Sequence, residues 1–415
     1  MNKVMTLGEI AVFKTGPFGT QLSASEYVTD GTPVINVRNI GYGEIITSDL
    51  EFISHTTAER LHEHVLQDGD IVFGRKGSVD RHAYIDDRYT GWIQGSDCIR
   101  VRMNGEINSR FISHYLKLDR VKKQINSSSV GSTMASLNTD ILSRIQIVLP
   151  SLKQQNNIEA VLSVFENKID LNTRICAKLE SMAKTLYDYW FTQFDFPNAE
   201  GKPYRSSGGK MVWNEQLKRE IPHGWEVGTI DSILAIDNNS VDPSKLGDTI
   251  MEHYSIPAFD DGKYPVYEPA NTIESGKYAV NRECILTSKL NPHFKRLWDP
   301  YCDTDNAICS TEFIVYRPRD LWTRSYCYAV LNSDSFYAHM VSNATASTGS
   351  RKRIQPDVSA SFQLAMPDEQ TMRAFVKVYD PILKQLKNLR KENHELASLR
   401  DWLLPMLMNG QATVE

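Results

Sequence analysis

Basic, hydroxyl and amide side chains gather in short glycine- or proline-containing segments, a combination suited to nucleic-acid binding. Residues 73–81 (FGRKGSVDR) carry Arg75, Lys76, Ser78 and Arg81 after an apolar stretch. Arginine and lysine can pair with guanine O6 and N7, whereas serine and backbone N–H groups hold phosphates. We interpret this segment as a loop that could contact DNA; a solvated surface loop with no partner is the alternative.

Three further segments share this composition. Residues 15–22 (TGPFGTQL) form a Gly-Pro turn beside Lys14, residues 288–296 (SKLNPHFKR) follow a second apolar stretch, and residues 347–353 (STGSRKR) are the densest basic run. Glycine and proline at these points indicate loops. With those of residues 73–81, the expected DNA-binding side chains are Lys14, Thr20, Gln21, Arg75, Lys76, Ser78, Arg81, Lys289, Asn291, Lys295, Arg296, Ser350, Arg351, Lys352 and Arg353.

The sequence offers no catalytic constellation. A phosphate-binding GxxxxGK[ST] loop, a GxGxxG cofactor loop and the Asn/Asp-Pro-Pro-aromatic motif of adenine methyltransferases are all missing. HEH at 62–64 has the wrong spacing for two zinc ligands on one helix. The six cysteines form no CxxC pair, which favours reduced thiols over a disulfide framework or a zinc site. We therefore expect no catalytic residue, metal or cofactor in this chain.

Length and composition predict a globular, cytoplasmic protein of two or three domains. The chain has 415 residues, and its 46 basic and 51 acidic residues give a net charge of −5. It lacks an apolar run of about 18 residues, and its N-terminus lacks the apolar core of a secretory signal. A protein that binds DNA mainly through its net charge is basic, whereas this chain is acidic. DNA contact here would therefore depend on local basic loops or on a partner.

The sequence contains an internal duplication. Residues 149–165 (LPSLKQQNNIEAVLSVF) resemble residues 366–382 (MPDEQTMRAFVKVYDPI), and the two initiating prolines are 217 positions apart. Residues 69–78 likewise resemble residues 282–291, each an apolar strand that runs into a basic loop. A period of this length indicates a duplicated domain rather than a solenoid, whose repeats span roughly 20–50 residues.

Each repeat closes with a long helix that carries a heptad pattern. The recurring positions, which we expect in a coiled-coil core, are Ile158, Phe165, Asn172, Leu179 and Leu186 in the first helix and Phe375, Ile382, Leu389, Leu396 and Leu403 in the second. Companion apolar residues three positions later are Val161, Ile175, Met182 and Tyr189, then Val378, Leu399 and Met406. Sustained heptads in matched register favour mutual pairing, and the alternative is two amphipathic helices on separate cores.

Two residues modify this helical pattern. Asn172 at a core position fits the use of a buried asparagine to set register. Pro381 is expected to kink or delay the second helix, because it removes a backbone donor and crowds the preceding turn. As one helix, residues 154–191 would be roughly 57 Å long at ~1.5 Å per residue, a length suited to a spacer.

The remaining segments predict an α+β fold. Residues 1–150 and 221–367 contain short strand patterns such as 33–40, 70–74 and 98–103, separated by turn signals. Helical periods occupy corresponding places at 111–125 and 326–341. We place the boundaries as follows: globular domains 1–150 and 221–367, helices 151–192 and 368–409, a Gly-, Pro- and Ser-rich linker 193–220, and a tail 410–415.

Taken together, these motifs resemble the specificity subunit of type I restriction–modification systems. In the first half the resemblance lies in TGPFGTQL, GDIVFGRKGS, the segment from GSTMASLN to FENKIDLN, and LESMAKTLYDYWF. In the second it lies in IPHGWEVGTI, SKLNP and the segment that starts at MPDEQ, which departs from the first repeat's LPSLKQQ and contains Pro381. It covers essentially the whole chain.

This resemblance implies separate roles for the globular domains, the two helices and the partner subunits. Residues 1–150 and 221–367 would be target-recognition domains, each reading one half of a split double-stranded DNA site. The two helices would pair antiparallel as a coiled coil that fixes the spacer. Two adenine methyltransferase subunits would dock on the chain, and ATP-dependent translocase–endonuclease subunits would join for cleavage. Those partners would supply S-adenosylmethionine, ATP and magnesium chemistry.

Two other functional classes remain as alternatives. A non-catalytic coiled-coil scaffold whose globular domains bind protein partners would also need paired helices, but basic loops at matching positions argue against it. A hydrolase or nuclease has the weakest support, because no motif indicates one.

Overall fold

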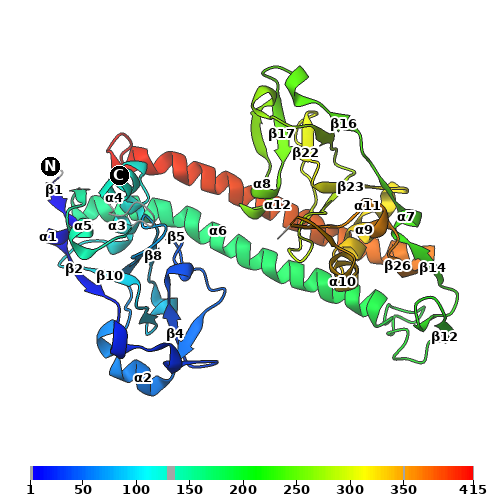
Figure 1. The fold of residues 1–415 in the computed structure, drawn as a ribbon, viewed down its shortest axis with the longest axis horizontal. Helices are drawn as coiled ribbons and strands as arrows, with labels where there is room; N and C mark the ends of the chain where they lie inside the picture. Colours follow the sequence, from blue (N-terminus) through cyan, green and yellow to red (C-terminus); the bar gives the residue numbers. More distant parts are fainter. Residues whose placement is uncertain (1–2, 129–135, 349–350, 415) are drawn as a thin grey trace. The chain divides into compact units, whose positions relative to one another are not determined.

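The computed structural model describes residues 3–128, 136–348 and 351–414 of the chain, which divides into two compact units. The first unit comprises Met1–Asn167 and Ala397–Glu415, and the second comprises Lys168–Leu396. Two long helices, α6 (Leu152–Tyr187) and α12 (Glu369–Met408), contribute residues to both units (Figure 1). In the described ranges, no helix combines the length and apolar character needed to cross a membrane.

The described residues of the first unit form three sheets. Strands β1 (Lys3–Thr6) and β11 (Gln146–Leu149) form an antiparallel pair. A five-stranded sheet has the order β2 (Ala11–Thr15), β10 (Cys98–Met103), β7 (Ile71–Gly74), β8 (His82–Tyr84) and β5 (Tyr42–Gly43). A four-stranded sheet has the order β3 (Tyr27–Val28), β6 (Glu51–Ile53), β4 (Thr32–Ile35) and β9 (Ile93–Gln94). Its short helices are α1 (Leu7–Ile10), α2 (His55–Arg60), α3 (Ser109–Leu116), α4 (Asp119–Ser128) and α5 (Thr139–Ser143).

The second unit repeats this plan. Strand β14 (Glu226–Thr229) pairs with β26 (Gln363–Met366), and a four-stranded sheet has the order β15 (Leu234–Ile236), β23 (Phe313–Pro318), β20 (Ile285–Ser288) and β21 (Leu297–Trp298). A second sheet has the order β16 (Ser240–Val241), β19 (Lys277–Ala279), β22 (Ala307–Ser310), β17 (Ile250–Tyr254) and β18 (Val266–Pro269). Its short helices are α7 (Ile230–Ile233), α8 (Ile256–Asp260), α9 (Arg324–Leu331), α10 (Asp334–Ser342) and α11 (Pro356–Ala360).

Backbone hydrogen bonds show how closely the units repeat each other. The residue after β7 donates its N–H to the residue before β10, from Arg75 to the Asp97 carbonyl at 2.8 Å. The residue after β20 does the same toward the residue before β23, from Lys289 to the Glu312 carbonyl at 2.9 Å. The α+β fold with duplicated globular parts and long helices, predicted from the sequence, is therefore confirmed.

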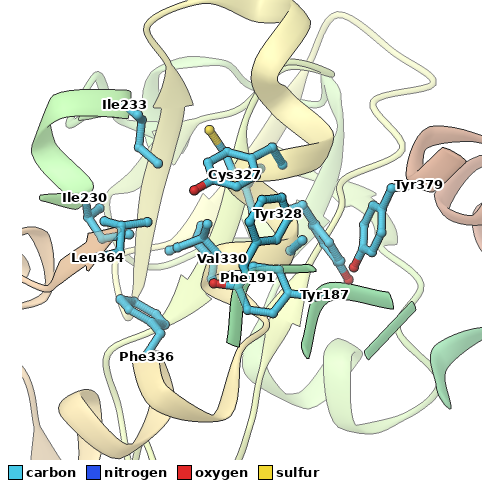
Figure 2. Packing of buried hydrophobic residues seen from close by; sticks show 14 of the residues in the cluster. Tyr187, Phe191, Ile230, Ile233, Cys327, Tyr328, Val330, Phe336, Leu364 and Tyr379 are labelled. Atoms are coloured by element: carbon cyan, nitrogen blue, oxygen red, sulfur yellow. The ribbon is translucent and has the colours of Figure 1, made fainter. Parts of the chain in front are cut away.

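The cores of the two units differ in chemistry. Aliphatic side chains dominate the first, where Ile158 and Leu162 of α6 share a buried cluster with Leu404 and Leu407 of α12. Aromatic rings dominate where the same helices meet in the second. There the Phe375 ring centroid lies 4.7 Å from that of Phe191, and Tyr187 and Phe191 lie in the cluster drawn in Figure 2. The helices are therefore held by ring packing in the second unit.

Contacts within the second unit give the direction of the helix pair. Asn172 of α6 donates to Glu392 Oε2 of α12 at 2.8 Å, whereas Phe191, after α6, contacts the earlier residue Phe375. The helices therefore run antiparallel. Asn172 is fully buried, and its Oδ1 has no hydrogen-bond partner within the described ranges. All ten predicted core positions are buried or half-buried.

The predicted companion register is wrong by one residue. Met182, Val378 and Leu399 are 58%, 48% and 49% exposed. The inward positions lie four residues after each core position: Leu162, Ile169, Cys176, Ala183 and Trp190 in the first helical segment, and Tyr379, Leu386, Asn393, Arg400 and Leu407 in the second. A heptad seam alternates steps of three and four. Because apolar residues occupy both candidate positions at several turns, spacing alone did not select between them.

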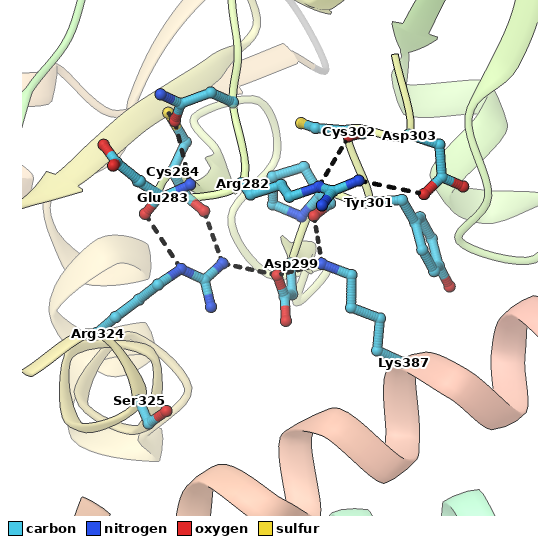
Figure 3. Close-up of polar contacts among 12 residues, drawn as sticks. Arg282, Glu283, Cys284, Asp299, Tyr301, Cys302, Asp303, Arg324, Ser325 and Lys387 are labelled. Carbon is cyan, nitrogen blue, oxygen red and sulfur yellow. Dashed lines mark hydrogen bonds and ion pairs between the residues drawn. The ribbon is translucent and has the colours of Figure 1, made fainter. Parts of the chain in front are cut away.

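Polar contacts brace α12 against the second globular domain. Asp299 accepts from Arg324 at 2.6 Å and from Lys387 of α12 at 3.2 Å, and Lys387 also donates to the Pro300 carbonyl (Figure 3). Because the Arg324 and Asp299 side chains are mostly buried, each charge needs its partner. The shared carboxylate therefore joins helix and domain within this unit.

The two short helical segments and Pro381 also differ from what the sequence predicts. The helical segments 111–125 and 326–341 each divide in two, as α3–α4 and α9–α10. In the second, Ser333 caps α10 by accepting from the Phe336 N–H, which starts a new helix. Pro381 does not interrupt α12, because it lies on the exposed face, where water can hydrogen-bond the freed carbonyl.

The predicted linker 193–220 is an ordered part of the second unit. Phe194 and Phe196 are buried, and the Phe196 ring stacks between Tyr204 and Trp225, with centroids 4.7 and 5.1 Å away. Strands β12 (Met211–Asn214) and β13 (Arg219–Pro222) then form a hairpin. The glycine, proline and serine content of residues 193–220 predicted a linker, and the aromatic residues of this segment pack into the core of the second unit.

Candidate nucleic-acid interface

Sheet topology brings the two predicted loops of the first unit to one edge. Strand β10 is antiparallel to both β2 and β7, so these two strands run parallel and end at the same edge of the sheet. The segments after Thr15 and after Gly74 both leave from there. At the start of the first segment, a Cβ on Gly16 would lie 1.9 Å from the Gly95 carbonyl oxygen, so only glycine fits.

The two loops touch through Arg75 and Phe18. The Arg75 guanidinium lies over the half-exposed Phe18 ring, 4.7 Å from its centroid, and Arg75 Nε is buried without a hydrogen-bond partner among the described residues. A guanidinium held flat on a ring keeps its outer N–H groups directed away from it. Lys76 is half-exposed and pairs with Asp97 at 3.2 Å. Thr20, Gln21 and Ser78 are exposed.

Arg81 makes a cation–π contact with Tyr42 that the sequence did not indicate. Its guanidinium lies 5.3 Å from the Tyr42 ring centroid, and Lys122 of α4 lies 4.6 Å from the same ring. Tyr42 and Lys122 are distant in sequence from residues 73–81, so no local pattern could associate them. Lys122 therefore adds a cation near Arg81 that the predicted set omitted.

Lys14 forms an ion pair with Glu63. Its Nζ lies 2.5 Å from Glu63 Oε2, and its hydrogen bond and charge lower the pKa of the exposed Glu63 carboxyl. Lys14 lies within β2 rather than in the loop. Its charge is therefore already balanced by a carboxylate, which makes it a weaker candidate for a phosphate contact than Arg75.

In the second unit the two predicted basic segments form one structure. Asn291, in the loop after β20, has a positive φ of 47° and donates its N–H to the Lys352 carbonyl at 2.7 Å. Its Oδ1 accepts from the Lys352 N–H at 2.9 Å. This binds the loop to strand β25 (Arg351–Arg353), which pairs with β24 (Thr345–Thr348). Asn291 thus holds the segments together through its side chain.

Several predicted DNA-binding cations of this unit are tied to carboxylates. Arg296 makes a bidentate pair with Asp260, with both N···O distances 2.8 Å, and Arg353 pairs with Glu312 at 2.7 Å. The hydrogen bond from Arg353 is the main cause of a lowered pKa at Glu312. Lys295 donates to the Asn332 carbonyl and lies 3.7 Å from Asp334. These groups brace the domain.

The remaining predicted residues of this unit are more available. Arg351 and Lys352 are exposed and Lys289 is half-buried. The charges of Lys289 and Arg351 help to lower the pKa of Glu312, but less than Arg353, which makes the direct pair. Ser350 lies outside the described residues. The structure thus groups Lys289, Arg351 and Lys352 on one loop and hairpin.

Comparison with known proteins gives matches to one family. Residues 2–181 match the family described as "Type I restriction modification DNA specificity domain". Over 322 residues, 74% of this chain and 70% of the relative, it is 24% identical to the type I restriction enzyme MjaIX specificity subunit of Methanocaldococcus jannaschii. Over 444 aligned positions, 91% of this chain and 94% of the relative, it is 20% identical to the HindI specificity subunit of Haemophilus influenzae.

A solved structure supports the fold. The type I restriction–modification S subunit from M. genitalium matches 98% of this chain and 96% of its own length, with a TM-score of 0.60 at 14% identity. This likeness shows the fold alone. The resemblance to type I specificity subunits that the motifs predicted is confirmed by the family match and the curated relatives.

Proposed function

We propose that this chain is the DNA-specificity subunit of a type I restriction–modification complex in which each globular domain reads one half of a bipartite duplex site. The observation that carries this proposal is the repetition of one strand order, with a basic loop after the same strand in each unit. Repeated domains can address two half-sites with equivalent geometry, as dimeric repressors do. Different loop residues would then give the two half-sites different sequences.

The helices serve in this proposal as the spacer between half-sites. Their antiparallel heptad seam and the buried Asn172 favour one register. A fixed register would set a fixed number of base pairs between the recognised halves. Adding one heptad to both helices should then lengthen the preferred spacer and leave both half-site sequences unchanged. An unaltered spacer preference in a folded variant would contradict this role.

Partner subunits supply the chemistry in this proposal, and this chain is non-catalytic. Two adenine methyltransferase subunits would bring S-adenosylmethionine, and restriction subunits would bring ATP and magnesium. Apolar residues that the helix pair leaves exposed offer docking surface: Val164, Leu171, Met182, Val378, Leu399 and Trp402. Exposed apolar side chains along a helix are a frequent feature of protein interfaces. DNA and these subunits are therefore the expected partners.

Adenine methylation across the source genome tests the central proposal. Single-molecule sequencing with and without this gene should reveal a bipartite motif whose methylation disappears on deletion and returns on complementation. An unchanged methylation pattern in a strain with active partner subunits would contradict the proposal. It would favour the scaffold alternative if the chain still bound its partners.

A further inference from the structure

The second unit contains a cavity to which the proposed DNA contacts assign no role. The cavity has a volume of about 430 Å³ and lies among residues of α6, α12 and the second globular domain. Tyr328, Tyr379, Leu383 and Leu386 give it an apolar wall; Tyr328 and Tyr379 are labelled in Figure 2. The space could accommodate a small organic molecule, since ligand sites combine apolar walls with a few convergent polar groups.

Four cations line this cavity and share two carboxylates. Lys263 lies 3.6 Å from Glu180, which also pairs with Arg390. Lys184 and Lys295 lie 2.7 and 3.7 Å from Asp334. Each carboxylate therefore balances one of its two cations and leaves an excess positive charge.

Partial burial adds a cost to this excess charge, since the Lys263 and Lys295 side chains are 38% and 35% exposed. Burial is the main cause of lowered pKa values at Lys263 and Lys295, and the neighbouring charges of Arg390 and Lys184 lower them further. Asp188 acts in the opposite direction on both Lys184 and Lys295, and like Asp334 it does not line the cavity. Four cations therefore face three carboxylates, and one positive charge remains in excess. An anion in the cavity would offset the repulsion between these cations, because opposite charges attract more strongly beside partly buried groups than in bulk water.

We propose that this cavity binds a small molecule that carries a phosphate group on an apolar or aromatic body. Arg390 can present two N–H groups to phosphate oxygens, and the lysines supply point charges. Tyr328 and the leucines would cover the apolar body. A small molecule fits better than the DNA backbone, because the cavity is bounded on several sides by the helices and the domain. This inference does not depend on the proposed DNA recognition.

Calorimetric titration of the full chain with sodium pyrophosphate and with ATP tests the site, against sodium chloride at matched ionic strength. Saturable binding is expected for both phosphate compounds. Lys263→Gln and Lys184→Gln should each weaken it at least tenfold, because each replaces a lining cation by a neutral polar side chain. Lys245→Gln, at an exposed lysine paired with Asp242 outside the cavity, is the matched control and should leave binding unchanged.

Three results would overturn the proposal. The first is the absence of saturable binding by the unsubstituted chain. The second is equal affinity in all three variants when they unfold like that chain. The third is displacement of pyrophosphate by a DNA duplex, which would assign the phosphate to the DNA backbone. Weakening in only the two cavity variants, with no displacement by duplex, would support a small-molecule site.

Discussion

Arg81 and Arg296 occupy equivalent positions in the two units but have different partners. Each directly precedes the strand that pairs with the loop-bearing strand, β8 with β7 and β21 with β20. Arg81 lies over the Tyr42 ring, whereas Arg296 makes its bidentate pair with Asp260. The same backbone position therefore presents a guanidinium on an aromatic ring in one unit and an ion-paired brace in the other.

This difference shows that duplication preserved the backbone but not the chemistry of the loops. A guanidinium on a ring can bind a phosphate or base without losing a carboxylate partner, whereas Arg296 would first have to leave Asp260. Under the proposed function, we expect the first unit to use Arg75 and Arg81 for recognition and the second to depend more on Lys289, Arg351 and Lys352. Unequal donors on equal scaffolds would then allow two different half-sites to be read.

The largest expected effect concerns the cores. Phe375→Ala should destabilise the second unit by about 3–5 kcal/mol, because this fully buried ring contacts Phe191 and Trp190. Leu404→Ala should mainly destabilise the first unit, by about 2–5 kcal/mol. Hydrogen exchange resolved by segment checks both. Equal loss of protection in the two units for either variant would contradict separate cores.

Recognition by the first unit gives the next largest effect. Replacement of Arg75 and Lys76 by alanine should weaken binding of one half-site by about 10–100-fold, because a good base contact is worth about 1–3 kcal/mol. Neither side chain is buried in the core, so stability should change little. Arg144→Ala, at an exposed arginine paired with Asp140, is the control. Undiminished affinity for both half-sites in the double variant would exclude this loop from recognition.

Sequence patterns predicted what depends on local spacing. Heptads located α6 and α12, and the repeat at 217 positions located the duplicated domains. They failed where contacts join distant residues. The partners of Arg296 and Arg353, Asp260 and Glu312, are 36 and 41 positions away, and nothing in a basic run indicates which of its charges are balanced. The aromatic anchors in residues 193–220 were hidden for the same reason.

A buried histidine offers a comparison that depends on pH. His82 pairs across from Phe73 on β7, and Leu297 occupies the equivalent position across from Thr287 on β20. Burial is the main cause that lowers the pKa of His82 to about 3. Because the unfolded chain binds a proton near pH 6.5, this site's stabilisation is complete above that pH and is lost as pH falls toward 3.

His82→Leu should therefore remove part of the acid sensitivity of the first unit. Between pH 7 and pH 5 the histidine alone should cost about 2 kcal/mol of unfolding free energy, and the variant should lack that loss. His114, also buried and with a pKa lowered to about 3, remains and retains its own contribution. Denaturant unfolding at both pH values checks this. An unchanged pH dependence would show that His82 is not neutralised by burial.

The smallest expected effect separates the two arginines directly. Arg296→Ala should destabilise the second unit by about 1–2 kcal/mol, because it removes a guanidinium that is only 12% exposed and leaves Asp260 unpaired. The loss stays in this range because the Asp260 carboxylate keeps contact with water. Arg81→Ala should cost the first unit less than about 1 kcal/mol, the value of an exposed cation–π contact, but should weaken DNA binding more than Arg296→Ala does. Denaturant unfolding and duplex titration of both variants would measure the two effects. If the two variants lost equal stability and equal affinity, the equivalent arginines would have the same role, and the contrast between a recognition residue and a brace would be wrong.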